Sequence, residues 1–179
     1  MKFFKFKKES GFTLVETLVA IAIFATAITG LIVISGRGIN DNVFVKNKLT
    51  ASYLAQEGVE IIRMMRDNAA LANPSSDYWE NFINNIDVCY SPDGTDVCWV
   101  DPAGPSIGPC DNQICENLGY DEYTGIYGYG FEESIFNREV RVVPVEDYEE
   151  ILIISDVSWT QGSNTYKTSY QYNLLNWVY

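Results

Sequence analysis

At residues 7–36 the chain reads KKESGFTLVETLVAIAIFATAITGLIVISG. Residues 12–36 form a nearly continuous apolar run whose single charge is Glu16, and the twenty residues from Thr17 to Gly36 carry none. About twenty apolar residues are enough for a helix to cross the hydrocarbon core of a bilayer. The composition therefore predicts a membrane-spanning helix close to the N-terminus.

The position of Gly11 distinguishes this segment from an ordinary secretory signal. Such a signal places its small residues and its cleavage site after the apolar run, whereas Gly11 precedes the run here. The run also contains Glu16, and a charged group at membrane depth costs about 2.5–3.5 kcal/mol on insertion scales. A residue kept at that cost is a candidate for function. The alternative is a plain signal anchor that is never processed.

Charge is distributed unevenly along the chain, whose formal net charge is −12. Residues 1–11 form a basic leader with four lysines against Glu9, whereas nineteen acidic residues from Asp67 onward face only three basic ones. The positive-inside rule predicts a cytoplasmic N-terminus and a head on the other side of the membrane. An acidic head repels phosphate backbones, so we expect no direct binding of nucleic acid by the head.

Residues 37–68 are predicted to continue the helix as an amphipathic segment that ends near Asp67–Asn68, before Pro74. Small and apolar residues recur there at helical spacing, with charged residues off the stripe. The stripe consists of Ala51, Leu54, Ala55, Gly58, Ile61, Ile62 and Met65. We interpret it as the face that packs on the domain's own sheet, with a partner-binding face as the alternative.

Residues 69–125 read as a loop region rich in turn-forming residues, and all four cysteines lie in it. An even number of cysteines in one loop-rich stretch indicates disulfides and an oxidising compartment. Zinc is the competing interpretation, but C-x8-C and C-x4-C spacings without any histidine fit structural zinc sites poorly. Three connectivities are open. We favour Cys89–Cys98 with Cys110–Cys115, since both close short local loops.

Residues 126–179 alternate between apolar and polar positions, the pattern of half-buried strands. Val140 and Val142 share one face, and a longer set follows on the next segment: Ile151, Ile153, Val157 and Trp159. A third segment places Tyr166, Thr168, Tyr170, Tyr172 and Leu174 on one face. Turn segments such as Gln161–Asn164 separate these runs, so the pattern predicts an antiparallel meander. The predicted fold class is α+β.

The run Lys7-Lys8-Glu9-Ser10-Gly11-Phe12-Thr13-Leu14-Val15-Glu16, followed by apolar residues, resembles the cleavage and methylation signature of type IV prepilins and type II secretion pseudopilins. The resemblance implies that a prepilin peptidase cuts after Gly11. It implies that Phe12 becomes the N-methylated mature N-terminus, and that Glu16 pairs with the N-terminal ammonium of a neighbouring subunit during assembly. It also implies the pilin fold, a long N-terminal helix whose second half packs on a C-terminal antiparallel sheet.

The function expected from this resemblance is that of a structural subunit of a type IV pilus or type II secretion pseudopilus. Its expected partners are prepilin peptidase, other pilin or pseudopilin subunits, and the inner-membrane assembly machinery. The chain would be a single-pass membrane protein that later joins an envelope or cell-surface filament. Residues 55–60, which read AQEGVE, and the closing strands resemble minor pilins of the V class and I-type pseudopilins. The apolar helix lacks the proline that many major pilins carry, which favours a minor subunit. Adhesion, motility, DNA uptake and secretion all stay open as the filament's purpose.

Tyrosines and aspartates of the head are the remaining candidates for binding sites. A tyrosine-rich set, Tyr120, Tyr123, Tyr127 and Tyr129, favours half-buried strand and loop positions, with a ligand-binding surface on a pilus-tip or membrane-tethered adhesin as the alternative. Asp93, Asp96 and Asp101 are interpreted as turn residues, with calcium binding as the alternative. The chain has no histidine and no catalytic motif, so neither enzymatic activity nor a cofactor is expected.

Overall fold

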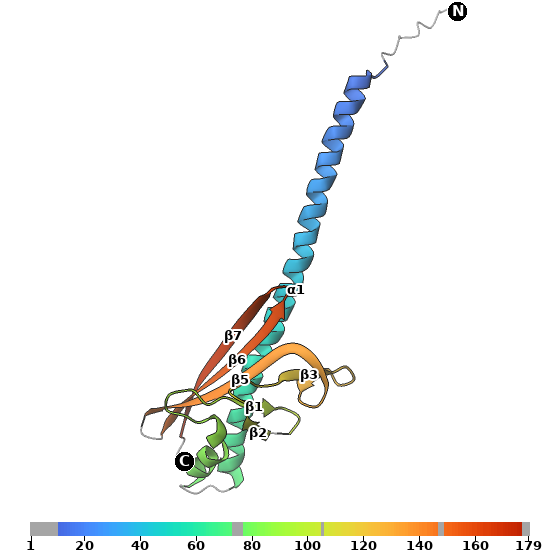
Figure 1. The fold of residues 1–179 in the computed structure, drawn as a ribbon. Coiled ribbons are helices and arrows are strands. Elements are labelled where there is room, and N and C mark those ends of the chain that lie inside the picture. Colours follow the sequence, from blue (N-terminus) through green and yellow to red (C-terminus); the bar gives the residue numbers. More distant parts are fainter. Residues whose placement is uncertain (1–10, 73–76, 105, 147–148, 177–179) are drawn as a thin grey trace, which may run out of the picture. The chain divides into compact units, whose positions relative to one another are not determined.

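A computed structural model describes residues 11–72, 77–104, 106–146 and 149–176. The chain divides into two compact units, the stem (Met1–Phe44) and the head (Val45–Tyr179). The order of elements is α1 (Leu14–Ala72), α2 (Tyr78–Asn85), the short 3-10 helix η1 (Asp87–Cys89), β1 (Cys98–Asp101), β2 (Ser106–Pro109), β3 (Asn117–Asp121), β4 (Ile126–Gly128), β5 (Glu132–Glu146), β6 (Glu150–Gln161) and β7 (Asn164–Leu175) (Figure 1).

In the stem, the α1 residues expose their apolar side chains. An apolar window of eighteen residues within α1 has none of its residues buried. Within the described residues this is one helix that is long and apolar enough to cross a membrane. A helix that is apolar on every side requires an apolar surrounding, supplied by lipid or by other helices.

In the head, the second part of α1 packs on an antiparallel sheet. The predicted stripe is buried from Ala51 to Ile62, and Met65 is half-buried at its end. Gly58 marks the closest approach, because a Cβ there would lie 2.5 Å from the Ser155 Oγ on β6. The prediction that the stripe packs on the domain's own sheet is confirmed.

In the described part of the chain the sheet has seven strands, and β5 lies at its centre. On one side β5 pairs with β6 along most of its length, and β6 pairs with the edge strand β7. On its other side β5 pairs with β3 near its start and with β1 at Val140. All of these pairings are antiparallel, and β6 and β7 join through the two-residue loop Gly162–Ser163, where Gly162 has φ 64°. Glycine adopts that left-handed conformation without a Cβ penalty.

The α+β prediction and the antiparallel meander β5–β6–β7 are confirmed. Two boundaries differ from the expectation. The helix continues to Ala72 rather than ending at Asp67–Asn68, and the half-buried Ala69 and Ala70 pack against the core in these extra turns. Residues 69–125 also hold α2, η1 and the strands β1 to β3, so the sheet begins at Cys98 rather than near residue 126. These elements are only three to eight residues long, too short for a clear periodic signal.

One hydrophobic core joins these layers. It combines Val59, Ile61 and Ile62 of α1 with Tyr78, Trp79 and Phe82 of α2, and with inward-facing strand residues. The strand residues are Val100, Val140, Val142, Ile151, Ile153 and Leu174. The buried half-cystines Cys89 and Cys98 also belong to it. The loop region is thus built into the core and does not lie over its surface.

Candidate functional site

The three residues singled out in the cleavage signature, Gly11, Phe12 and Glu16, lie at or just before the start of α1. Gly11 and Phe12 lie outside the helix, which begins at Leu14. Phe12 is 77% exposed, and among the described residues beyond its chain neighbours no atom lies within 4 Å of the place where a Cβ on Gly11 would stand. The upstream residues of the signature, Lys7 to Ser10, lie outside the described residues. The Gly11–Phe12 peptide bond is therefore in exposed, non-helical backbone, the form that a protease can bind.

Thr13 explains why the helix begins where it does. Its Oγ1 accepts a hydrogen bond from the backbone N–H of Glu16 at 3.3 Å, and its carbonyl oxygen accepts one from the N–H of Thr17 at 3.2 Å. Thr13 is thus the N-cap of α1, and Thr13 with Glu16 three residues later has the sequence pattern of a capping box. The sequence analysis missed this role of Thr13, although a threonine three residues before a glutamate and ahead of an apolar run is the known signal.

Glu16 lies in the first turn of α1, where the helix dipole favours a negative charge. Its side chain is exposed, and in the described part of the chain it forms no salt bridge. The apolar side chains around it are exposed as well, among them Leu14 at 75% and Val15 at 68%. In lipid this carboxylate would have no water beside it, and among the described residues no cation pairs with it. A positively charged group placed beside the Glu16 carboxylate would therefore stabilise it.

Arg138 is a second feature that the sequence analysis missed. It lies on β5, is fully buried, and its guanidinium bonds to three residues on two other elements of the head. It donates to the Leu54 carbonyl at 3.2 Å, to the Glu57 carboxylate at 2.7 Å, and to the Val100 carbonyl at 2.6 Å. Arg138 thus joins α1, β5 and β1. The available signal was its position two residues before Val140, which puts it on the inward face of the strand.

Replacing Arg138 with methionine should destabilise the head by about 3 kcal/mol, since two buried carbonyls and a carboxylate would lose their donor. Urea unfolding of the full chain in maltoside micelles, followed by tryptophan fluorescence, measures this. Arg141→Met on the same strand is the matched control. Arg141 faces Asp156, which keeps Lys167 as a partner, so the loss should stay below about 1 kcal/mol. Equal losses in the two variants would contradict the role given to Arg138.

Asp156 forms a second charge cluster, on the opposite face of the sheet. Its side chain is 4% exposed and forms ion pairs with Arg141 and with Lys167, the latter at 2.9 Å. Burial alone would raise the pKa of the Asp156 carboxyl. Hydrogen bonds from Lys167 and Ser169, with the charges of Lys167 and Arg141, outweigh burial and hold the pKa below its usual value.

A carboxyl whose pKa is lower in the folded state contributes stability above its unfolded pKa of about 3.9, and this is lost as pH falls through the folded value. Asp156→Asn should therefore cost about 2 kcal/mol at pH 7 and progressively less below about pH 4. Urea unfolding of both proteins across that range checks the sign. A difference that stayed constant with pH would contradict the assignment.

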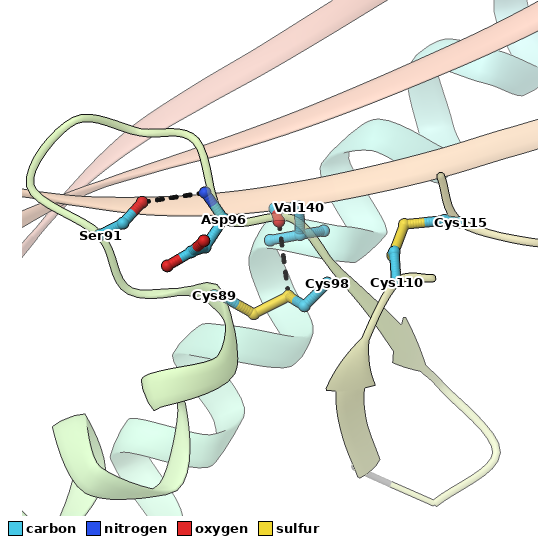
Figure 2. The surroundings of a disulfide bond; sticks show 7 residues. All are labelled: Cys89, Ser91, Asp96, Cys98, Cys110, Cys115 and Val140. Atoms are coloured by element: carbon cyan, nitrogen blue, oxygen red, sulfur yellow. Dashed lines mark hydrogen bonds between the residues drawn. A yellow bond between two sulfur atoms is a disulfide. The ribbon is translucent and has the colours of Figure 1, made fainter. Parts of the chain in front are cut away.

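The structure pairs Cys89 with Cys98 and Cys110 with Cys115, with Cα–Cα distances of 5.1 and 4.6 Å. Figure 2 shows the Cys98 side of the first bridge close to β5, where its Sγ lies 3.4 Å from the Val140 carbonyl oxygen. Beside it, Ser91 Oγ accepts a hydrogen bond from the Asp96 N–H at 3.0 Å. The first bridge ties η1 to β1 within the core, and the second closes the short loop after β2.

The remaining candidates separate into turn residues and surface residues. Asp93 accepts hydrogen bonds from the Thr95 N–H and hydroxyl, and Asp101 accepts one from the Ala103 N–H, as in Asx turns. Within the described residues no three His, Cys, Asp or Glu side chains gather where they could hold a metal ion. Tyr127 and Tyr129 are half-buried, whereas Tyr123 is fully exposed between β3 and β4.

The comparisons with known proteins match the N-terminal segment. Residues 6–32 match the family described as the prokaryotic N-terminal methylation motif. No curated protein and no solved structure matches the chain. The motif indicates a type IV pilin or pseudopilin, a class of structural subunits that are processed by prepilin peptidase and assemble with other pilins. The matched range contains Gly11, Phe12, Thr13 and Glu16 together.

Proposed function

We propose that this chain is the precursor of a minor subunit of a type IV pilus or type II secretion pseudopilus, cut by prepilin peptidase between Gly11 and Phe12. The observation that carries the proposal is the position of that bond. It lies in exposed backbone two residues before the helix, inside the matched methylation motif. Cutting there leaves the whole apolar helix on the product. The mature protein would therefore stay in the membrane until it is assembled.

Processing would also create the partner that Glu16 lacks. Cutting frees an α-amino group on Phe12, whose usual pKa of about 7.7–8.0 makes it largely cationic at neutral pH. N-methylation leaves that nitrogen basic. An uncompensated carboxylate in lipid gains most from a cation placed beside it. In the proposed assembly, the N-terminal amine of a neighbouring subunit forms an ion pair with Glu16. This pair fixes the register of the packed helices.

The exposed apolar surface of the stem supports the same assignment. Large side chains remain uncovered along α1, including Ile21, Phe24, Leu31 and Ile34, each more than 60% exposed. In the precursor lipid would cover them, and in the filament equivalent helices would. The leader is basic and the head acidic, so we place the N-terminus in the cytoplasm and the head outside. The absence of a proline from residues 12–36 favours a minor over a major subunit.

Recovery in filaments tests the assembly role. Envelope filaments sheared from cells that express the chain should contain it in the processed form, detectable by mass spectrometry and by antibody labelling along the fibre. The membrane fraction after shearing serves as the internal reference. A processed chain that never leaves the membrane fraction would contradict assembly while leaving the cleavage proposal intact.

A ligand-binding role at a filament tip is the second candidate, favoured by the fully exposed Tyr123 in the β3–β4 hairpin. An exposed aromatic with a polar tip is common at binding surfaces. Tyr123→Ala should then leave the amount of filament unchanged and reduce adherence of the cells to their surface. Unchanged adherence would remove the support for this role.

A further inference from the structure

A small pocket lies beside the Cys110–Cys115 loop, and the proposed assembly makes no use of it. Its volume is about 300 Å³, at the lower end of the range for ligand pockets. It belongs entirely to the head. The residues that line it are Trp99, Pro109, Cys110, Asp111, Ile114, Glu116 and Tyr129. Aromatic rings, apolar groups and carboxylates share this lining, and none of the lining residues is basic.

Two aromatic rings form one part of the wall. The Trp99 and Tyr129 ring centroids are 5.3 Å apart, and the ring planes are inclined at 59°. Trp99 is held against β2, because a Cβ on Gly108 would lie 2.5 Å from its indole ring. Because Gly108 has no side chain, the Trp99 indole can pack directly against the β2 backbone. Inclined aromatic faces of this kind attract cations through the negative potential of the ring face.

Two carboxylates form the rim. Asp111 lies inside the disulfide loop, and Glu116 follows its closing cysteine. The loop is braced by the Ile114 N–H, which donates to the Asp111 carbonyl at 2.9 Å, and by the Asn137 side chain, which donates to the Cys115 carbonyl. Asp111 is therefore carried within the closed loop, and Glu116 lies directly after it. The disulfide restrains the backbone next to both residues.

The charge of the pocket is negative at neutral pH. The pKa of the Tyr129 hydroxyl is raised to about 12, chiefly by burial, with the carboxylates of Asp101 and Glu116 contributing and the charge of Arg138 opposing. Tyr129 thus stays neutral, and the charge of the lining is that of Asp111 and Glu116. A cation entering here would meet the carboxylates of Asp111 and Glu116 and the aromatic side chains of Trp99 and Tyr129.

We propose that this pocket binds an organic ammonium group, supplied either by a small amine or by a lysine side chain. A bare metal ion fits less well, since calcium requires six to eight oxygen ligands and much of this lining is apolar or aromatic. An alkylammonium group combines a positive charge with apolar carbon atoms. The charge would face the carboxylates, and the carbon atoms would contact the aromatic and apolar lining. The small volume suits a headgroup of a few heavy atoms.

Ligand-observed NMR on the full chain in dodecyl maltoside tests this. Phosphate buffer replaces amine buffers, and detergents with choline headgroups are left out. Choline is compared with its uncharged isostere 3,3-dimethylbutan-1-ol, and N-acetyl-lysine amide with N-acetyl-norleucine amide. The charged member of at least one pair should bind roughly tenfold tighter than its neutral partner. The pair with the larger ratio identifies the source of the ammonium group.

The variant Asp111→Asn with Glu116→Gln should weaken binding of the charged probe by about fivefold and leave the neutral one unchanged. Both side chains are exposed, so the fold should tolerate these substitutions. Glu80→Gln, which removes an exposed carboxylate on α2 away from the pocket, is the matched control and should bind as wild type. Equal binding of charged and neutral probes, or a double variant that binds like the control, would overturn the proposal.

Discussion

Replacing Gly11 with valine is expected to leave the chain uncut in cells that contain an active prepilin peptidase. The residue before the scissile bond has no side chain, and nothing lies within 4 Å of the place where a Cβ would stand. A free approach to the peptide bond is therefore available to an enzyme in wild type. A β-branched side chain there would displace the bond from the catalytic groups, and small misplacements can slow an enzyme roughly a hundredfold.

The measurement is the ratio of precursor to mature chain on a gel, in cells with and without the peptidase. Gly30→Val is the matched control, because the same change inside α1 also meets open space and lies nineteen positions from the cut. It should be processed as wild type. Normal processing of the Gly11 variant would contradict the assignment of the cut site, and loss of processing in both variants would point to failed insertion instead.

Replacing Glu16 with glutamine is expected to separate processing from assembly. The variant should be cut at the wild-type rate, because Glu16 lies in the helix, beyond the non-helical segment that holds the scissile bond. The amount found in sheared filaments should fall roughly a hundredfold, as expected when one partner of an ion pair in an apolar surrounding is lost. Glutamine also lowers the cost of placing this residue in lipid, so poor membrane insertion could not explain the loss.

Glu60→Gln provides the matched control for this experiment. Glu60 is also an α1 carboxylate, but it lies in the head, where it pairs with Arg63 at 2.6 Å and is 58% exposed. Its loss should change stability by less than about 1 kcal/mol and leave the filament fraction unchanged. Full assembly of the Glu16 variant would contradict the pairing proposed for that carboxylate.

How far the sequence predicts this molecule depends on the length of each pattern. The apolar run of residues 12–36, the stripe from Ala51 to Met65 and the alternation in β6 extend over many residues. The structure shows the first two within one helix and the third as a strand. The helix α2 and strands β1 and β2 did not stand out. A few residues between turns give no usable period, and their burial depends on core partners that are distant in sequence.

The functional residues show the same division. Gly11, Phe12 and Glu16 lie within six residues of one another, so they can be predicted as site residues from the sequence alone. Arg138 is different, because its partners Leu54 and Glu57 lie more than eighty positions away. The alternation places Arg138 on the same face as Val140, but it does not show which distant groups the guanidinium binds. The pocket beside Cys110–Cys115 likewise depends on Trp99 and Tyr129 meeting across the sheet.

The central claim is that processing converts this precursor into an assembly-competent subunit by exposing an amine at Phe12. N-terminal sequencing with intact mass measurement tests it most directly, on protein extracted from membranes of cells with an active prepilin peptidase. We predict a chain that lacks residues 1–11 and begins with N-methylated Phe12. A mature chain that still begins at Met1 would contradict the account.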